Sequence, residues 1–404
     1  MSGVHGQMLG HLARRGVAVM DSNRDAYMKS LEHKSQIYDN SPMKDVKPWE
    51  AAVVFLTLAT FMIVYASIKY TLGEVVASLA MIEQPRTLVV SEYRPVNDDD
   101  KDSSDVSQAQ DRLLDEEVST FKEVPITASI RQTVRHLASV GGYSARWRGI
   151  SISVVYHFLQ AVAAHGLAGL FSLLPVFGPF AFVFGSILST VLLARIHMTW
   201  THIMVSQPSP LPWYRRIPSG RTYFKALITP AFIFAMAQHL TVVLPLMVYF
   251  SFGPVSNNPE VIDPKHEGIR LIAMLATMAF VGIALLLPAS VTLTRVEASL
   301  LPDDVETIVP FDRTLGGAAA NLVGFGKINF RALYDAAWRS FDKASRIRLI
   351  KFYVKYAAIL MALTMAFTAI ITTEVAVLGG ERLLLLTQNA NAQMELSMMR
   401  TGGH

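Results

Sequence analysis

The residues best suited to chemistry are neutral polar side chains inside long apolar stretches. Five of them stand out: His157, Gln160, His165, Gln238 and His239. Residues three or four apart share one face of a helix, so His157 and Gln160 are expected to point together, with His165 two turns further on. Polar groups are costly in lipid and normally face a wet cavity or a neighbouring helix. We predict that these five bind a solute; hydrogen bonding between helices is the alternative.

Catalytic and metal-binding signatures are missing from the sequence. The chain has no Cys, which excludes disulfides and thiolate chemistry. It has no glycine-rich phosphate loop, no His-x-x-x-His pair on a helix and no nucleophile elbow. Its basic residues are not interleaved with aromatic ones, as a nucleic-acid-binding surface would require. We therefore expect a protein that is not an enzyme, uses no cofactor or metal, and binds no nucleic acid.

The apolar stretches point to a lipid environment. Charged residues make up 17% of the chain, against about 25% in soluble proteins. From Gly149 to Ala194 there is no Asp, Glu, Lys or Arg. A bilayer core about 30 Å thick needs roughly 20 apolar residues per helix. This stretch therefore predicts two crossings, separated near Pro175 and Pro179, in an integral membrane protein.

The apolar runs predict an all-α fold with six transmembrane helices. In order, the runs cover about residues 51–82, 150–174, 180–205, 226–252, 270–295 and 356–373. Apolar residues at helical spacing also predict two short surface helices, at 126–137 and 330–341. The loop between the third and fourth spans is rich in proline and predicts no such helix.

The remaining segments are polar. Residues 1–47 are expected to form a mobile N-terminal tail and residues 377–404 a polar C-terminal tail, on either side of a membrane domain at 48–376. Residues 97–117 form an acidic, serine-rich insert, a composition typical of disordered segments.

Basic residues near the span ends predict the orientation. They gather in three long loops: Arg131, Arg135, Arg146 and Arg148; Arg215, Arg216, Arg221 and Lys225; Arg346, Arg348, Lys351 and Lys355. The positive-inside rule places these loops in the cytosol or the mitochondrial matrix, with both termini on the other side. Besides the bilayer itself, anionic lipid headgroups are expected partners of six residues in or beside these loops: Trp147, Arg148, Arg215, Arg216, Trp338 and Arg339.

A weak repeat runs through the odd-numbered spans. Each copy ends in a small polar residue followed, five positions later, by a charge: Ser78 and Glu83, Thr190 and Arg195, Ser290 and Arg295. The copies recur roughly every hundred residues, which defines three two-helix repeats at about 48–174, 175–252 and 266–376. An aromatic–arginine element also precedes each even-numbered span.

Two segments resemble signatures of the mitochondrial carrier family. Pro288 matches the kink proline of its odd-numbered helices, Thr294-Arg295 matches the pair that follows, and Gly142 to Gly149 is similar to its glycine–aromatic–arginine element. The resemblance implies three two-helix repeats with pseudo-threefold symmetry around a central cavity, in the mitochondrial membrane. It implies a divergent carrier-like transporter that moves a small solute by alternating access.

The same resemblance assigns gate-signature positions, namely Ser78, Glu83, Thr190, Arg195, Pro288, Ser290 and Arg295. Ser290 and Leu293 stand where the family has an acid and a base, so its interhelical salt bridges are not expected here. Arg195 and Arg295 are alternatively interpreted as anchors at the membrane interface.

Two further interpretations stay open. The chain is either a carrier-shaped adaptor or membrane-morphology protein without transport, which the missing gate charges favour, or an unrelated six-helix protein of the endoplasmic reticulum or another endomembrane.

Overall fold

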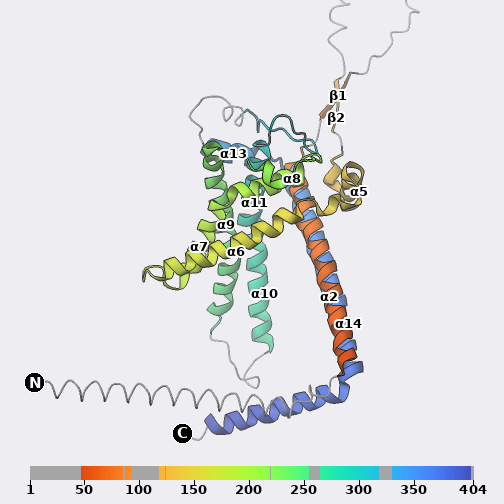
Figure 1. The fold of residues 1–404 in the computed structure, drawn as a ribbon, viewed down its shortest axis with the longest axis vertical. Helices are drawn as coiled ribbons and strands as arrows, with labels where there is room; N and C mark the ends of the chain where they lie inside the picture. The colour runs from red at the N-terminus through yellow and green to blue at the C-terminus, as the bar shows by residue number, and fades with distance from the viewer. Residues whose placement is uncertain are drawn as a thin grey trace, which may run out of the picture. The chain divides into compact units, whose positions relative to one another are not determined.

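The computed structural model describes residues 47–84, 87–91, 118–122, 124–218, 220–253, 264–317 and 330–401. The secondary structure of these residues is helical except for one antiparallel strand pair, β1 (Thr87–Ser91) and β2 (Val118–Lys122), seen in Figure 1. The acidic insert and the N-terminal tail predicted above lie outside the described residues, apart from Lys47. The chain divides into two units, residues 67–359 and residues 1–66 with 360–404.

Five helices in the described residues are long and apolar enough to cross a membrane, or six if one bent pair forms a single span. This is consistent with an integral membrane protein and agrees with the predicted spans. The helices are α2 (Pro48–Tyr70) with α3 (Ala77–Ile82), α6 (Ile150–Ser172), α7 (Ala181–Leu192) with α8 (Ala194–Val205), α9 (Arg221–Ser251), α10 (Pro264–Val281) with α11 (Leu287–Ser299), and α14 (Lys343–Thr401).

All three odd-numbered spans are interrupted. A π-helical turn (Thr71–Val76) separates α2 from α3, and another (Gly282–Leu286) separates α10 from α11. Between them, α7 meets α8 at an angle of 58°. Pro288 explains the interruption of the fifth span. A proline has no N–H, and its ring collides with the carbonyl four residues earlier, which lies inside the π turn. The other two interruptions contain no proline.

The predicted surface helices are present. They are α5 (Ile130–Gly141) and α13 (Phe330–Arg339), and each buries apolar residues of its predicted stripe, Leu137 in α5 and Leu333 in α13. The proline-rich third loop forms only a short 3₁₀ turn, Trp213–Arg216, as its composition predicts.

The sixth span is longer than its prediction. The apolar run predicts a span from about 356 to 373, whereas the candidate span of the structure covers Lys343–Leu378, within a helix α14 that runs from Lys343 to Thr401. Hydropathy marks where a helix leaves the apolar region, whereas a helix ends only where the backbone pattern fails. The residues beyond 378 include no proline and many good helix formers, such as Leu, Gln, Glu and Met.

In the unit of residues 67–359, the segments beyond the three interruptions pack together. Helices α3, α8 and α11 each contact the other two. All three contribute buried apolar side chains to one core, among them Leu79, Met204 and Val291, and α8 and α11 also share a second core through Met198 and Val296. In the same unit α9 and α10 lie side by side in Figure 1 and contact each other.

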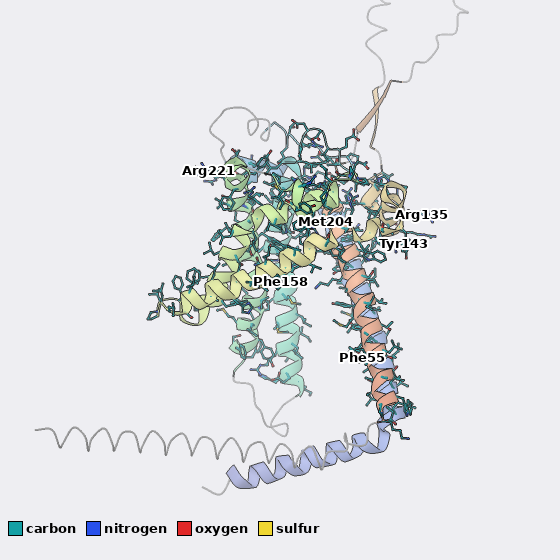
Figure 2. All side chains as sticks on the ribbon, viewed as in Figure 1. Phe55, Arg135, Tyr143, Phe158, Met204 and Arg221 are labelled. Carbon is teal, nitrogen blue, oxygen red and sulfur yellow. The ribbon has the colours of Figure 1, made fainter. Side chains whose placement is uncertain are left out.

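Helices α6 and α7 form the tightest hairpin of this unit. A Cβ atom placed on Gly185 of α7 would lie 2.7 Å from the backbone nitrogen of Ala168 and 2.8 Å from the carbonyl oxygen of Ala164, both on α6. Only glycine permits this approach. The outer face of α6 stays open, and Phe158, labelled in Figure 2, is 66% exposed.

The unit of residues 1–66 and 360–404 contains a helix pair from α2 and α14. The rings of Phe61 and Phe367 stack with centroids 3.8 Å apart. Thr57 Oγ1 donates a hydrogen bond of 2.6 Å to Glu374 Oε1. An apolar cavity of about 470 Å³ lies beside this pair, lined by Val53, Ile370, Thr373, Glu374 and Val377.

Candidate functional site

Buried ionisable side chains meet where α8 packs on α11. Glu297 of α11 is fully buried, and its Oε1 lies 2.6 Å from Nδ1 of His197 on α8. Thr201 Oγ1 donates a hydrogen bond of 2.6 Å to the other carboxylate oxygen. His202 places Nε2 at 2.7 Å from the backbone oxygen of Glu297. One residue of α11 thus holds more than one turn of α8. Met204, on the next turn of α8, is buried in the adjoining core (Figure 2).

The local sequence explains this arrangement. His197 and Thr201 are four residues apart, so they share one face of α8 and can reach the two oxygens of one carboxylate. A buried carboxylate is tolerated only when its oxygens are paired. With Glu297 ionised, the protonated ring nitrogen of His197 must be Nδ1, because a carboxylate has no proton to donate.

Aromatic rings surround this pair. The ring centroids of Tyr156 and Trp200 lie 5.2 Å and 5.6 Å from that of His197, both edge-on. The ring of His157 lies 5.5 Å from that of Trp200. Trp200 Nε1 donates to the hydroxyl of Tyr70 at 3.1 Å. Edge-to-face contacts of this kind hold rings in fixed orientations, so the position of the imidazole is well defined.

A second carboxylate faces the same histidine. Glu74 lies in the π turn of the first span and interacts electrostatically with His197 and Lys69. It also acts on Tyr156 of α6 and Tyr353 of α14. The first, third and fifth spans therefore contribute Glu74, His197 and Glu297 to one region, which we call the polar cluster, together with Thr201 and His202.

The five predicted solute-binding residues do not assemble into one site. His157 lies at the edge of the polar cluster, through Trp200. Gln160 instead donates through Nε2 to Thr190 Oγ1 of α7 at 3.0 Å, which is the interhelical alternative. His165 is exposed and its Nδ1 contacts the carbonyl of Ala161, on its own helix, at 2.8 Å. On α9, Gln238 is exposed and His239 half-buried.

The first two charges of the repeat each bind the loop segment that follows their own span. Glu83 is buried and accepts hydrogen bonds from the backbone N–H groups of Ile126 (2.6 Å) and Thr127 (3.0 Å), just before α5. Arg195 donates through Nε to the carbonyl of Pro218 at 3.1 Å, just after the 3₁₀ turn.

The third charge, Arg295, is fully buried, so its interpretation as an interfacial anchor is wrong. Its Nε donates to the carbonyl of Ala337 at 3.0 Å, and Nη2 donates to Ser340 Oγ at 2.9 Å. Nη1 donates to the carbonyls of Met81 and Ile82, at 3.1 and 3.3 Å. These carbonyls end α3, where backbone acceptors lack helical partners and a cation is favoured. Arg295 therefore connects α11 to both α3 and the end of α13.

The smaller signature residues lie inside the helices. Ser78 is buried in α3, and Pro288 begins the first turn of α11. Ser290 Oγ donates to the carbonyl of Leu287 at 2.9 Å, and Thr190 Oγ1 donates to that of Ser186 at 3.0 Å. Both hydroxyls donate within their own helix, and that of Thr190 also accepts the hydrogen bond from Gln160 of α6.

The predicted lipid contacts fall into two groups. Arg215 and Arg339 are exposed. The other four have protein partners. Trp147 donates to Ser67 Oγ, Arg148 to the carbonyl of Ile203 and Arg216 to Ser206 Oγ, each at 2.9 Å. The guanidinium carbon of Arg346 lies 4.1 Å from the ring centroid of Trp338.

Sequence reasoning missed the centre of the polar cluster. His197, Glu297 and Thr201 were outside the predicted site, because charged residues near span ends usually lie at the interface. One signal was available. His197 and Glu297 follow Arg195 and Arg295 by two residues each, so they occupy equivalent positions of the repeat, and their separation of 100 residues equals the spacing of those copies.

A basic cavity of about 230 Å³ lies elsewhere in this unit, between the start of α5 and the start of α14. It is lined by Thr127, Ile130, Arg348, Lys351, Phe352 and Lys355. No residue of the polar cluster lines this cavity. Within the residues that the structure describes, no three His, Cys, Asp or Glu side chains are grouped as metal ligands. Comparison with protein-family models gives no match for this chain, and comparison with curated proteins gives none either.

Proposed function

We propose that this protein is a carrier-like membrane transporter that moves a small solute by alternating access. The mutual contact of α3, α8 and α11 carries the proposal. Each of these segments follows an interruption in a transmembrane span, and discontinuous helices are where secondary transporters bind their substrates and open their gates. π-Helical turns are likewise frequent at functional sites.

The junction of α3, α8 and α11 would act as a gate. Helix α11 holds both neighbours, α3 through Arg295 and α8 through Glu297. Opening the junction must separate these buried partners, and an unpaired buried charge is strongly destabilising. The junction therefore favours two discrete arrangements, one with the partners joined and one with both hydrated, as an alternating gate requires.

This gate would differ from the gate of the family that the sequence resembles. There, an acid and a base on the odd-numbered spans form interhelical salt bridges, at positions that hold Ser290 and Leu293 here. In this chain the charged contact between the third and fifth spans is His197 with Glu297, two turns further along the helix. The proposal is thus a transporter with its own gate chemistry.

The basic loops support a membrane with the cytosol or the mitochondrial matrix on one side, and we propose the mitochondrial membrane. Arg215 and Arg339, which remain exposed, are the proposed contacts to anionic headgroups. Fractionation of cells that express the full chain checks the organelle. Enrichment in the endoplasmic reticulum would favour the endomembrane interpretation instead.

The full-length protein, purified and reconstituted in liposomes, tests transport. Uptake of labelled inorganic and organic anions, nucleotides and amino acids is measured one by one. Saturable uptake of at least one solute, raised by the same solute on the inside, is the expected result. Should no solute be taken up or shift the melting temperature, while a stoichiometric protein partner co-purifies, the adaptor interpretation replaces transport.

A further inference from the structure

The centre of the polar cluster is closely packed, with Glu297, Thr201 and His202 all buried. A proton is a ligand that needs no cavity. We propose that His197 and Glu297 form the proton-binding site of this membrane domain, and that proton binding controls the α8–α11 contact. The inference rests on the proposed function for its role in transport, whereas the proton site itself stands on the geometry that follows.

The first argument is how the two partners reach solvent. The side chain of His197 is 16% exposed, whereas that of Glu297 is not exposed at all. Nδ1 of His197 lies 2.6 Å from Oε1 of Glu297. The other ring nitrogen of His197, Nε2, is therefore the one that can exchange a proton with water. A proton from water forms an N–H bond at Nε2, and the ring becomes an imidazolium that still donates through Nδ1. Release reverses the step, without any redox change.

The second argument is the charge balance at the contact. With a protonated imidazole, His197 and Glu297 form a buried pair of opposite charges. With a neutral imidazole, the carboxylate keeps two hydrogen bonds but loses its cation. Removal of one partner from a buried pair is strongly destabilising. Proton loss therefore weakens the connection between α8 and α11, and proton binding restores it.

The neighbouring charges do not replace the imidazolium. Glu74 places a second carboxyl group in electrostatic range of His197, and Lys69 interacts with Glu74. The side of α9 presents the ring of Phe234, which does not titrate. The other titratable groups near the pair are Tyr156 and His157 on α6, Tyr353 on α14, and His202 on α8 with Arg216 and Arg313 beyond it.

The experiment measures the melting temperature of the full-length protein in detergent from about pH 5 to pH 8, where histidine titrates. Glu297→Gln and His197→Gln are compared with the wild type. The matched controls are Glu267→Gln, which removes a carboxylate paired with Arg270 at 2.6 Å, and His165→Gln, which removes an exposed histidine.

A proton site predicts that the stability loss caused by Glu297→Gln or His197→Gln changes by several degrees across this pH range. A merely structural contact predicts the same loss at every pH, and that result would overturn the inference. The controls should give differences that are parallel across the range. If both cluster variants fail to fold, Thr201→Val carries the test, because it removes one hydrogen bond to the carboxylate and keeps both titrating groups. The midpoint of the pH profile must then move, and an unchanged midpoint rejects the site.

These measurements need no solute, so their outcome is separate from that of the uptake screen. A pH-dependent contact without uptake would keep the proton site and reject transport. Uptake with a pH-independent contact would do the reverse.

Discussion

His197 and Glu297 lie 100 residues apart in the chain, yet Nδ1 of His197 is 2.6 Å from Oε1 of Glu297. They occupy equivalent positions of the predicted repeat, two residues beyond Arg195 and Arg295, in the third and fifth spans. Equivalent positions of two repeats meet where the two spans cross at the same depth. The contact therefore links a weak signal in the sequence to a buried polar contact in the structure.

The α6–α7 hairpin predicts a sharp difference between two glycines. Gly185→Ala would place a Cβ atom 2.7 Å from backbone atoms of α6, so the helices must separate. We expect a loss of about 1–3 kcal/mol in the free energy of unfolding, measured by thermal unfolding in detergent. Gly169→Ala, on α6 with no atom within 4 Å of the new Cβ, should be neutral or slightly stabilising. Equal effects of the two substitutions would contradict the close approach.

Arg295 is expected to be the most sensitive cation of the membrane domain. Arg295→Gln removes charged hydrogen bonds to carbonyls of α3 and α13, each worth roughly 1.5–3 kcal/mol. The purified variant should unfold at a markedly lower temperature than the wild type. Arg339→Gln, which changes an exposed arginine on α13, should stay within about 0.5 kcal/mol. A similar loss in both would show that charge alone, rather than these contacts, matters.

Glu83 should tolerate loss of its charge poorly. Its carboxylate accepts hydrogen bonds from Ile126 and Thr127 and lies 3.8 Å from Nη2 of Arg348. Glu83→Gln leaves Arg348 without its anion, and the amide can turn its NH₂ group toward the N–H donors of Ile126 and Thr127. We expect the free energy of unfolding to fall by about 3–5 kcal/mol. Limited proteolysis between residues 124 and 130 should become faster. Glu306→Gln, on an exposed side chain, serves as the control, and equal cleavage of both variants would refute the role of Glu83.

Asp312 lies outside the spans and predicts a pH effect. Burial acts to raise the pKa of Asp312, but it is outweighed by hydrogen bonds from Thr314 (2.7 and 2.9 Å) and Gly316 (3.2 Å) and by the charge of Arg295, which hold this pKa below its usual value. A lowered pKa stabilises the folded state above the usual aspartate range, near pH 4, and this stability is lost as pH falls through the lowered pKa.

Asp312→Asn should therefore lower the melting temperature at neutral pH, and its difference from the wild type should shrink as the pH falls below about 4. Thr314→Val removes one of the donors and should give an intermediate effect. A difference between Asp312→Asn and the wild type that stays constant down to the lowest pH would refute the assignment.

Much of the fold follows from the sequence because a bilayer imposes one length on every apolar helix. The spans beginning near Ala51 and Ile150 were predicted for this reason, whereas the surface helix α13 was predicted from apolar residues at helical spacing. The π turn at 71–76 was not predicted, because its sequence contains no proline to mark an interruption of the helix. Its Gly73 is placed by tertiary packing, with the hydroxyl of Tyr356 only 2.7 Å from where a Cβ atom would lie.

The site was predicted less well than the fold. His157 and Gln160 are predicted to share one solute site, but Gln160 bonds to Thr190 on α7 and His157 contacts the ring of Trp200 on α8. Helical spacing alone does not reveal which helix each side chain meets. Glu297 and His197 stand near the ends of their apolar runs, where ionisable residues usually lie at the membrane interface. Whether such a residue is exposed or buried against another helix depends on how the long loops pack over the helix end. The local sequence pattern does not show that packing.

The bond from His202 to the main chain of Glu297 limits what can move. It uses a peptide oxygen, so neither a side-chain substitution at 297 nor a change of protonation there deletes it. The two contacts therefore differ in kind: the one from His197 depends on the side chain at 297, and the one from His202 does not. If the proposed gate opens here, the His202 contact would be the point about which the third span turns.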